Sequence, residues 1–315
     1  MKPRSLVALL GAAALSLSLA ACGSGSTNTD AAAAGGSNSV CPDGTLTFGV
    51  EPYDDAAKLI PAYRAVGADL GKKLGCKVDV QISESYVAEI LAMKNGKLDL
   101  GEFGPAGFVF ASQQAKAVPL ASFADKNGKL STYTAGIWVK KGSPITSLAQ
   151  LKGHTLALGE TGSTSGDWEP RYALVKAGID KDVKTQYAGG HPEALQALVH
   201  GKVDAAEINS QTETSAQAAG TFHPSDYTEI WKSGPIANDP IAAAPSLSAD
   251  ARKKIQQALL SLSASDFTTG GDSSIATELA FTPPSSGKVM LPVTTDTYRQ
   301  LFDLAKSLGL SAKDL

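Results

Sequence analysis

Three adjacent hydroxyl side chains, Ser163, Thr164 and Ser165, are followed by Gly166 in the stretch "GETGSTSGDWEP". The run "TLALG" before them is typical of a strand, and "WEPRYALVKAG" after them is typical of a helix. A helix start has unpaired backbone N–H groups and the positive end of the helix dipole. One hydroxyl is enough to cap it, so the others can donate hydrogen bonds to an anion. The alternative is a solvated turn with one ordinary cap. We refer to these three residues as the hydroxyl loop.

Other chemistries have weaker support in the sequence. The hydroxyl loop lacks the Gly-Lys-[Ser/Thr] ending of a Walker loop, so nucleotide hydrolysis is not expected. The four histidines, at positions 154, 191, 200 and 223, do not have metal-binding spacing. No Cys-His or Ser-His pair is legible either. We therefore expect no metal, no cofactor and no catalytic activity.

The elements around the hydroxyl loop follow from the periodicity of apolar residues. Residues 44–50 alternate as in a strand, and apolar residues recur every three or four positions from Ile60 to Leu74, as in a helix. A strand "KVDVQI", a helix around residues 87–91 and a strand "KLDLGEFG" follow. This β-α-β-α-β order predicts a parallel sheet with crossover helices.

The second half of the chain repeats this order. "HTLALG" is followed by a helix over residues 168–177, the strand "VKTQYAG", a helix around 194–199 and the strand "KVDAAEI". Both halves contain Gly-Lys-x-Asp between a helix and a strand, with the glycines, Gly96 and Gly201, 105 residues apart. Glycine there ends a helix in the left-handed conformation. We therefore predict two similar α/β lobes.

The chain is expected to cross between the lobes twice. "YTAGIWVKKGSP" suits the first crossing, and "EIWKSGPIANDPIAAA" suits the return. We assign residues 41–136 with 238–315 to lobe 1, and residues 137–237 to lobe 2. A late helix around Tyr298 is expected to pack on lobe 1. Ligands of open α/β sheets bind outside the carboxyl ends of the strands, so the hydroxyl loop should face a cleft between the lobes.

The N-terminus has the features of an export signal. Lys2 and Arg4 precede an apolar stretch that is too short for a stable membrane span, and residues 1–21 are predicted to be a signal peptide. "LAAC" resembles the lipobox of bacterial lipoproteins, which would make Cys22 the lipidated first residue; the alternative is an ordinary signal peptide and an unrelated cysteine. Residues 22–40 are mostly small or polar and predict a flexible tether. Lipid and tether would hold the protein at the outer face of the cytoplasmic membrane.

The composition is that of a soluble globular protein. Of the 315 residues, 43% are hydrophobic and 19% are charged, and the net charge is −3. The chain has no basic run long enough to indicate nucleic-acid binding.

Cys41 and Cys76 are predicted to form a disulfide. An exported compartment permits such bonds, and the two residues precede the first and second predicted strands. Adjacent strand starts would bring them together. The alternative is two separate thiols. They are not expected to bind a metal, since no nearby His or Cys completes a site.

Several long motifs, in one order over roughly residues 44–245, resemble the phosphonate-binding proteins. "STSGDWEP" resembles their Ser-Thr-Ser-Gly-x-x-x-Pro signature, and "SYVAEILAMKNGKLDLGEFGP", "AGGHPEAL" and "IWKSGPIANDPI" resemble three further segments. That family comprises the substrate-binding components of phosphonate and phosphite ABC importers. The resemblance implies a type II periplasmic-binding-protein fold, with two lobes that are each a mostly parallel sheet with flanking helices.

The resemblance also implies which residues contact the ligand. The hydroxyl loop and His191 would donate to the phosphonyl oxygens, two tyrosines would reach the ligand, and a carboxylate would face the hydroxyl loop. These residues are Tyr86, Tyr133, Ser163, Thr164, Ser165, His191 and Asp239. Asn209 and Gln211 are further candidates for residues that contact the ligand. Taken alone, His191 is typical of a helix start, the tyrosines of a core or rim, and Asp239 before Pro240 of a turn.

One position departs from the pattern of the family. Binders of 2-aminoethylphosphonate hold the ammonium with a second carboxylate, and that position here is Gln211. Glu207 is expected to point elsewhere on a strand, and Glu213 is two positions away. Asp239 is then the one assured carboxylate partner. This favours a small alkylphosphonate, phosphite or another substituent over an aminophosphonate.

The expected mechanism is hinge closure. Charge-assisted hydrogen bonds contribute roughly 1.5–3 kcal/mol each, and a ligand that touches both lobes favours the closed state. A membrane permease with its ATPase would accept the ligand from this form, and the protein is expected to be a monomer. Phosphite or phosphate in the same site is the alternative ligand. A ligand-sensing lipoprotein or an enzyme with the same fold is the alternative of another class.

Overall fold

The computed structural model describes residues 40–268, 275–279, 282–285 and 287–310. The predicted signal peptide, Cys22 and all but the last residue of the predicted tether lie outside these ranges. The described residues belong to one compact unit of the chain. Among their helices, none has both the length and the apolar character that a membrane crossing requires.

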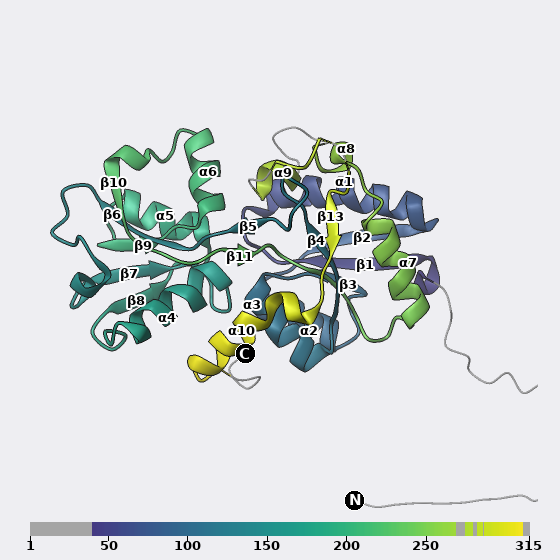
Figure 1. The fold of residues 1–315 in the computed structure, drawn as a ribbon, viewed down its shortest axis with the longest axis horizontal. Coiled ribbons are helices and arrows are strands. Elements are labelled where there is room, and N and C mark those ends of the chain that lie inside the picture. Colours follow the sequence, from purple (N-terminus) through teal and green to yellow (C-terminus); the bar gives the residue numbers. More distant parts are fainter. Residues whose placement is uncertain (1–39, 269–274, 280–281, 286, 311–315) are drawn as a thin grey trace, which may run out of the picture. The chain divides into compact units, whose positions relative to one another are not determined.

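The strands form two large sheets and one short ribbon (Figure 1). The six-stranded sheet has the order β13-β4-β12-β3-β1-β2, with β1 (Thr45–Val50), β2 (Lys77–Ile82), β3 (Leu100–Glu102), β4 (Val118–Phe123), β12 (Ile241–Ala243) and β13 (Met290–Pro292). The five-stranded sheet has the order β10-β6-β9-β7-β8, with β6 (Gly136–Lys140), β7 (Thr155–Leu158), β8 (Lys184–Tyr187), β9 (Ala205–Glu207) and β10 (Tyr227–Lys232).

Each sheet has a parallel core of three strands, β2-β1-β3 and β8-β7-β9, which antiparallel pairings extend. We call the six-stranded sheet with its helices lobe 1 and the five-stranded sheet with its helices lobe 2. The predicted fold class of two α/β lobes is thereby confirmed. The residue boundaries given to the lobes above stay a prediction.

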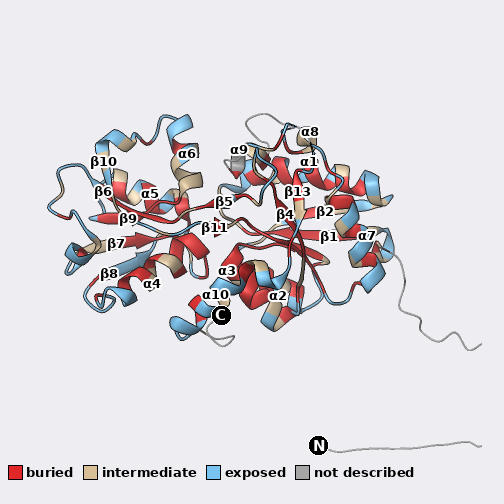
Figure 2. Cartoon of the chain, in the orientation of Figure 1, coloured by how far each residue is buried: buried red, intermediate tan, exposed pale blue. Residues whose placement is uncertain are grey.

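Helices cover both sheets, and the central strands β1, β3, β7 and β9 are mostly buried, whereas the outer strands β8 and β10 are exposed or half-buried (Figure 2). In lobe 1 and lobe 2 the helices before the return crossing are α1 (Ala56–Leu74), α2 (Tyr86–Lys94), α3 (Pro105–Phe110), α4 (Glu169–Lys176), α5 (His191–Val199) and α6 (Ser210–Ala218). The later helices are α7 (Ala249–Leu259), α8 (Ala264–Thr268), α9 (Ile275–Glu278) and α10 (Arg299–Ser307). The segment Thr164–Trp168 is a π-helical turn that leads directly into α4.

Helix α1 forms where the periodicity predicts it. Asp55 caps its start by accepting a hydrogen bond from the backbone N–H two residues on, and Gly75 ends it with φ of 72°. Tyr63, Val66 and Leu70 lie in the core of lobe 1. The helix therefore follows from local capping signals and from one apolar face.

The repeated Gly-Lys-x-Asp sequence makes the same contacts in both lobes. The two glycines have φ angles of 69° and 65°, which only glycine adopts at low cost. The carboxylate of Asp99 accepts hydrogen bonds from the backbone N–H and the hydroxyl of Thr47, both at 2.8 Å. Asp204 accepts the equivalent pair from Thr155, also at 2.8 Å. The motif thus joins the third strand of each β-α-β-α-β unit to its first.

Two crossings join the lobes as predicted. β5 (Thr132–Tyr133) pairs with β11 (Ile236–Ala237) in an antiparallel ribbon between the two sheets. The C-terminal helix α10 packs on α3, and the ring of Tyr298 lies 5.3 Å from that of Phe108. The prediction that this helix packs on lobe 1 is therefore confirmed.

The predicted disulfide is present. Cys41 and Cys76 are bonded, with their Cα atoms 6.4 Å apart, and they precede the neighbouring parallel strands β1 and β2. The bond closes a loop over a sequence separation of 35 residues.

Removal of the disulfide is expected to lower stability by roughly 3–4 kcal/mol, because it restores the loop entropy of the unfolded chain. The double variant Cys41→Ser, Cys76→Ser should therefore unfold roughly 5–10 °C below the wild type. Thermal unfolding with and without reductant measures this. Reductant should lower the midpoint of the wild type and leave that of the double variant unchanged; equal midpoints for the two proteins would contradict the expectation.

Candidate functional site

A pocket between the lobes, with a cavity volume of about 30 Å³, is lined by all nine residues that the sequence suggests for the ligand. They are Tyr86, Tyr133, Ser163, Thr164, Ser165, His191, Asn209, Gln211 and Asp239. Residues that the sequence analysis does not propose complete the lining, namely Glu51, Tyr53, Asp54, Gly104, Thr212 and Ser215.

The three hydroxyls are held in different ways. Ser163 caps the π-helical turn by accepting from the backbone N–H of Gly166 at 3.1 Å. The hydroxyl of Thr164 accepts from the backbone N–H of Ala106 in lobe 1 at 2.8 Å. The hydroxyl of Ser165 accepts from the side-chain amide of Asn209 at 3.1 Å. Because a hydroxyl that accepts in this way keeps its own hydrogen, Thr164 and Ser165 can donate to a further acceptor.

Asp167 holds the hydroxyl loop in place through contacts of its carboxylate. Its buried carboxylate accepts from the Gly162 backbone N–H at 2.9 Å and from the Tyr187 hydroxyl at 2.7 Å, and it pairs with Arg171 at 3.2 Å. These contacts pre-set the positions of the three hydroxyls before a ligand arrives.

His191 is a charged donor at the pocket wall. It begins α5 and is buried, and its Nδ1 lies 2.5 Å from the carboxylate of Glu207 at the end of β9. Burial lowers the pKa of His191, but the charge and hydrogen bond of Glu207 outweigh it and raise the pKa above its ordinary value. The other nitrogen, Nε2, lies 3.2 Å from the Ser163 hydroxyl. The imidazolium therefore presents Nε2–H beside the hydroxyl loop.

Glu207 does not line the pocket, in agreement with the expectation that it points away from the ligand. Its side chain lies behind His191, where it is fully buried. It acts on the pocket through the imidazole, as the partner that orients the ring and maintains its charge.

Three buried carboxylates lie at the lobe 1 side. Glu51 follows β1, Glu102 ends β3 and Asp239 precedes β12, so all three lie at one edge of the sheet. Their exposed fractions are 3%, 0% and 5%. Burial raises the pKa of Asp239 to about 7 against the opposing effects of a hydrogen bond from Glu102 and the charge of His191. Burial and the neighbouring acids raise the pKa values of Glu51 and Glu102 well above normal. The cluster therefore keeps its protons to a higher pH than exposed carboxyl groups do.

Asp239 is positioned through its neighbour. The Asn238 carbonyl accepts from the hydroxyls of Ser122 at 2.9 Å and Tyr298 at 2.8 Å. Since Tyr298 directly precedes α10, the C-terminal helix contributes to the geometry of the pocket.

Gln211 lines the pocket, but its amide also contacts lobe 1. Its Nε2 donates to the Leu279 carbonyl at 3.1 Å and lies 3.5 Å from Oδ1 of Asn238. The expectation of one carboxylate opposite the hydroxyl loop is incomplete, because Glu51 and Asp54 also line the pocket.

Two hydrogen bonds join the lobes beside the pocket. The first is the bond from Ala106 N–H to Thr164, and the second runs from the Tyr86 backbone N–H to the Glu160 carboxylate at 3.3 Å. Both donors lie at the starts of lobe 1 helices, where backbone N–H groups are unpaired within the helix. The structure therefore has the two lobes in contact around the pocket.

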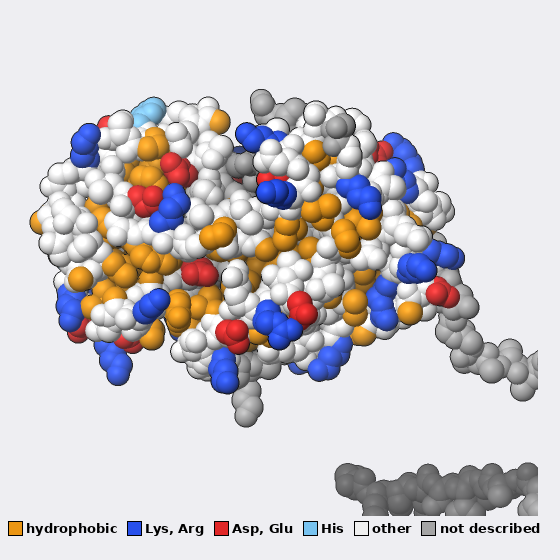
Figure 3. Space-filling view, in the orientation of Figure 1, with side chains coloured by type: hydrophobic (Ala, Val, Ile, Leu, Met, Phe, Trp, Pro, Cys, Tyr) orange, Lys and Arg blue, Asp and Glu red, His pale blue; other side chains and the backbone are white. Residues whose placement is uncertain are grey.

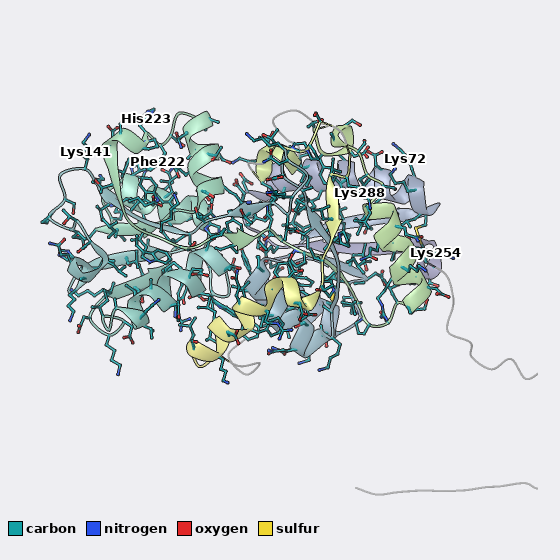
Figure 4. All side chains as sticks on the ribbon, viewed as in Figure 1. Lys72, Lys141, Phe222, His223, Lys254 and Lys288 are labelled. Atoms are coloured by element: carbon teal, nitrogen blue, oxygen red, sulfur yellow. A yellow bond between two sulfur atoms is a disulfide. The ribbon has the colours of Figure 1, made fainter. Side chains whose placement is uncertain are left out.

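None of the described residues that line the pocket is a lysine or an arginine. Figure 4 shows Lys72, Lys141, Lys254 and Lys288 on the outer surface, and all four are exposed. On the face in Figure 3 the basic side chains are scattered rather than gathered in one patch. Within the described part of the chain, no group of His, Cys, Asp and Glu is arranged to hold a metal ion. An anion in the pocket would meet neutral donors and His191.

Two α/β lobes joined by two crossing strands, with a polar pocket between them, define a solute-binding protein of the type II periplasmic fold. The chain belongs to the family of periplasmic substrate-binding proteins of phosphonate ABC transporters, whose model matches residues 48–285. It is therefore the substrate-binding component of an ABC transporter, and the family implies export.

Named relatives agree with this class. The chain is 28% identical over 224 residues to the "Phosphate-import protein PhnD" of Mycolicibacterium smegmatis, which covers 67% of this chain and 70% of that protein. It is 29% identical over 216 residues to the "Phosphonates-binding periplasmic protein" of Escherichia coli, which covers 67% of this chain and 64% of that protein. The fold is similar to that of PhnD1 from Prochlorococcus marinus in complex with methylphosphonate, with a TM-score of 0.70 and 19% identity. The superposition covers 85% of this chain and 99% of that chain.

Proposed function

We propose that this protein binds a small phosphonate between its lobes and delivers it to the permease and ATPase of an ABC importer. The observation that carries the proposal is the arrangement of donors in the pocket. Ser163, Thr164, Ser165 and the His191 imidazolium converge on one wall, and the described lining residues include neither lysine nor arginine. An oxyanion that loses its water in a closed cleft recovers its hydrogen bonds from such a wall.

Phosphate or phosphite is the second candidate ligand. The relative from Mycolicibacterium smegmatis is named a phosphate-import protein. The hydroxyl loop and His191 would donate to the oxygens of any of these anions, so the two proposals differ in the fourth substituent on phosphorus.

The predicted signal peptide and Cys22 support an exported lipoprotein at the outer face of the cytoplasmic membrane. We propose that the protein is a monomer without catalytic activity. We also propose that it binds its ligand by hinge closure, since residues of both lobes line the pocket.

Calorimetric titration of the purified protein tests the proposal. Methylphosphonate, 2-aminoethylphosphonate, phosphite, phosphate and sulfate are titrated separately, and one phosphorus anion is expected to bind with a Kd in the micromolar to nanomolar range. Ser165→Ala should raise that Kd about 10- to 150-fold, because one charge-assisted bond is lost. Thr214→Ala, at an exposed position on α6, is the control and should leave it unchanged. No binding of any of the five by the folded protein would exclude this function.

A further inference from the structure

Glu51 is a pocket residue that the sequence analysis leaves without a role. It directly follows β1, lines the pocket and is 3% exposed. Its carboxylate lies against Gly104 at the start of α3, where a Cβ on residue 104 would come within 2.5 Å of Oε1. The glycine therefore makes room for this carboxylate, and the Gly104 backbone N–H forms a hydrogen bond with it.

One oxygen of Glu51 lacks a partner. Among the described residues no group donates to Oε2, although this atom is inaccessible to solvent. A buried carboxylate oxygen without a donor is costly. Since the carboxylate lines the pocket, a donor carried by the ligand is the partner that the structure lacks.

The surroundings of Glu51 determine which ligands can supply this donor. The titratable groups that face it are Glu89, Glu102, Glu160, Asp239, Tyr86 and Tyr133. All six are acids, and His191 on the opposite wall is the cation among the described lining residues. An anion oxygen without a hydrogen places its lone pairs against the unpartnered Oε2 of Glu51, whereas an oxygen that carries a proton forms a hydrogen bond there.

We propose that Glu51 is a specificity-determining residue, which accepts a hydrogen bond from a protonated oxygen of the bound anion. The pocket then selects phosphorus oxyanions that keep one proton over anions of the same shape that have none, such as sulfonates and sulfate. This inference rests on the proposed function. The hydroxyl loop and His191 bind the ionised oxygens, and Glu51 binds the P–OH group.

The test compares two pairs of ligands that differ in the proton. Methylphosphonate is paired with methanesulfonate, and phosphate with sulfate, by calorimetry near pH 6, where each phosphorus anion still carries at least one proton. For the pair that the wild type binds, the Kd of the sulfur anion should exceed that of the phosphorus anion by a ratio of about 100 or more. Glu51→Gln should reduce that ratio at least about tenfold, mainly by weakening binding of the phosphorus anion, because the glutamine amide can place N–H donors where the carboxyl group has an accepting oxygen.

Glu84→Gln is the matched control, since Glu84 is exposed in the loop before α2. It should leave the ratio unchanged. If Glu51→Gln shifts both members of a pair equally, Glu51 has only a structural role and the inference is wrong, while the proposed function stands. If the wild type binds no phosphorus anion, both fail.

The wild type alone provides a second test, which holds even if the variant does not fold. As pH rises from 6 to 9, methylphosphonate loses its last proton, so its Kd should rise relative to that of methanesulfonate. Phosphate keeps one proton over this range, so its Kd should rise less relative to that of sulfate. Deprotonation of His191 affects both members of a pair and cancels in the ratio. A ratio of methylphosphonate to methanesulfonate affinity that stays constant over this range would overturn the inference.

Discussion

His191→Ala is expected to raise the Kd for the phosphorus oxyanion by about 100-fold or more at pH 7. The substitution removes the charged donor beside Ser163, and a hydrogen bond to a charged group contributes roughly 1.5–3 kcal/mol. It also leaves Glu207 buried without the cation that neutralises it. Calorimetric titration of the variant measures the change, and a thermal melt reports whether it is folded.

The matched control is His200→Ala, which lies exposed at the end of the same helix, α5. It should bind as tightly as the wild type. A Kd for His191→Ala within about threefold of the wild-type value would show that the imidazolium does not contact the ligand.

The pH dependence separates charge from shape at this position. The raised pKa of His191 means that the imidazolium is present below that pKa and is lost as pH rises through it. Glu207→Gln removes the charge that raises the pKa. Its Kd should therefore begin to rise at a lower pH than that of the wild type, and the two proteins should bind alike in mild acid.

The elements that carry the hydroxyl loop were predictable because their signals are local. Capping, glycine at positive φ and the apolar periodicity of α1 act within a few residues of one another. Ser163 could be placed at the cleft because it follows the carboxyl end of a strand. The same rule applies to Glu51 after β1, so its position was accessible from the sequence, although its role depends on Gly104 and Asp239, which are distant in the chain.

Other site residues depend on contacts that local patterns do not encode. Glu207 faces His191 because β9 packs against α5. The apolar pattern of a strand predicts which residues are buried, but it does not predict which side chain each of them contacts. The amide of Gln211 is engaged by the Leu279 carbonyl, from a segment after the return crossing. The sequence therefore indicated that Gln211 lines the pocket, but it did not indicate which group its amide contacts.

The two walls of the pocket therefore have opposite character. The lobe 2 wall offers hydrogen atoms from hydroxyls and an imidazolium, while the lobe 1 wall offers carboxyl groups that keep their protons to a higher pH than exposed ones do. An anion that bridges the walls forms hydrogen bonds with both lobes. It therefore binds the closed state more tightly than the open state and favours closure. Because the ligand-free protein keeps several acids buried close together, this arrangement lowers its stability.

Asp239→Asn is expected to stabilise the ligand-free protein at pH 8 by about 2–4 kcal/mol, while it weakens ligand binding. The ordinary pKa of Asp239 is 3.8 and the folded value is about 7. Between these values the folded state keeps a proton that the unfolded state has released. The stability of the wild type therefore falls as pH rises through this window and levels off above pH 7. Asparagine cannot ionise and avoids that loss.

The measurement is urea unfolding of wild type and Asp239→Asn at pH 4.5, 6 and 8 without ligand. The stability difference between the two should be small at pH 4.5 and grow toward pH 8. Asp303→Asn, at an exposed position on α10, should show no such growth. A difference that is constant with pH would mean that Asp239 titrates alike in the folded and unfolded states. In that case the buried acids of lobe 1 would not hold protons at neutral pH, and Glu51 would face a fully charged cluster that repels any oxyanion.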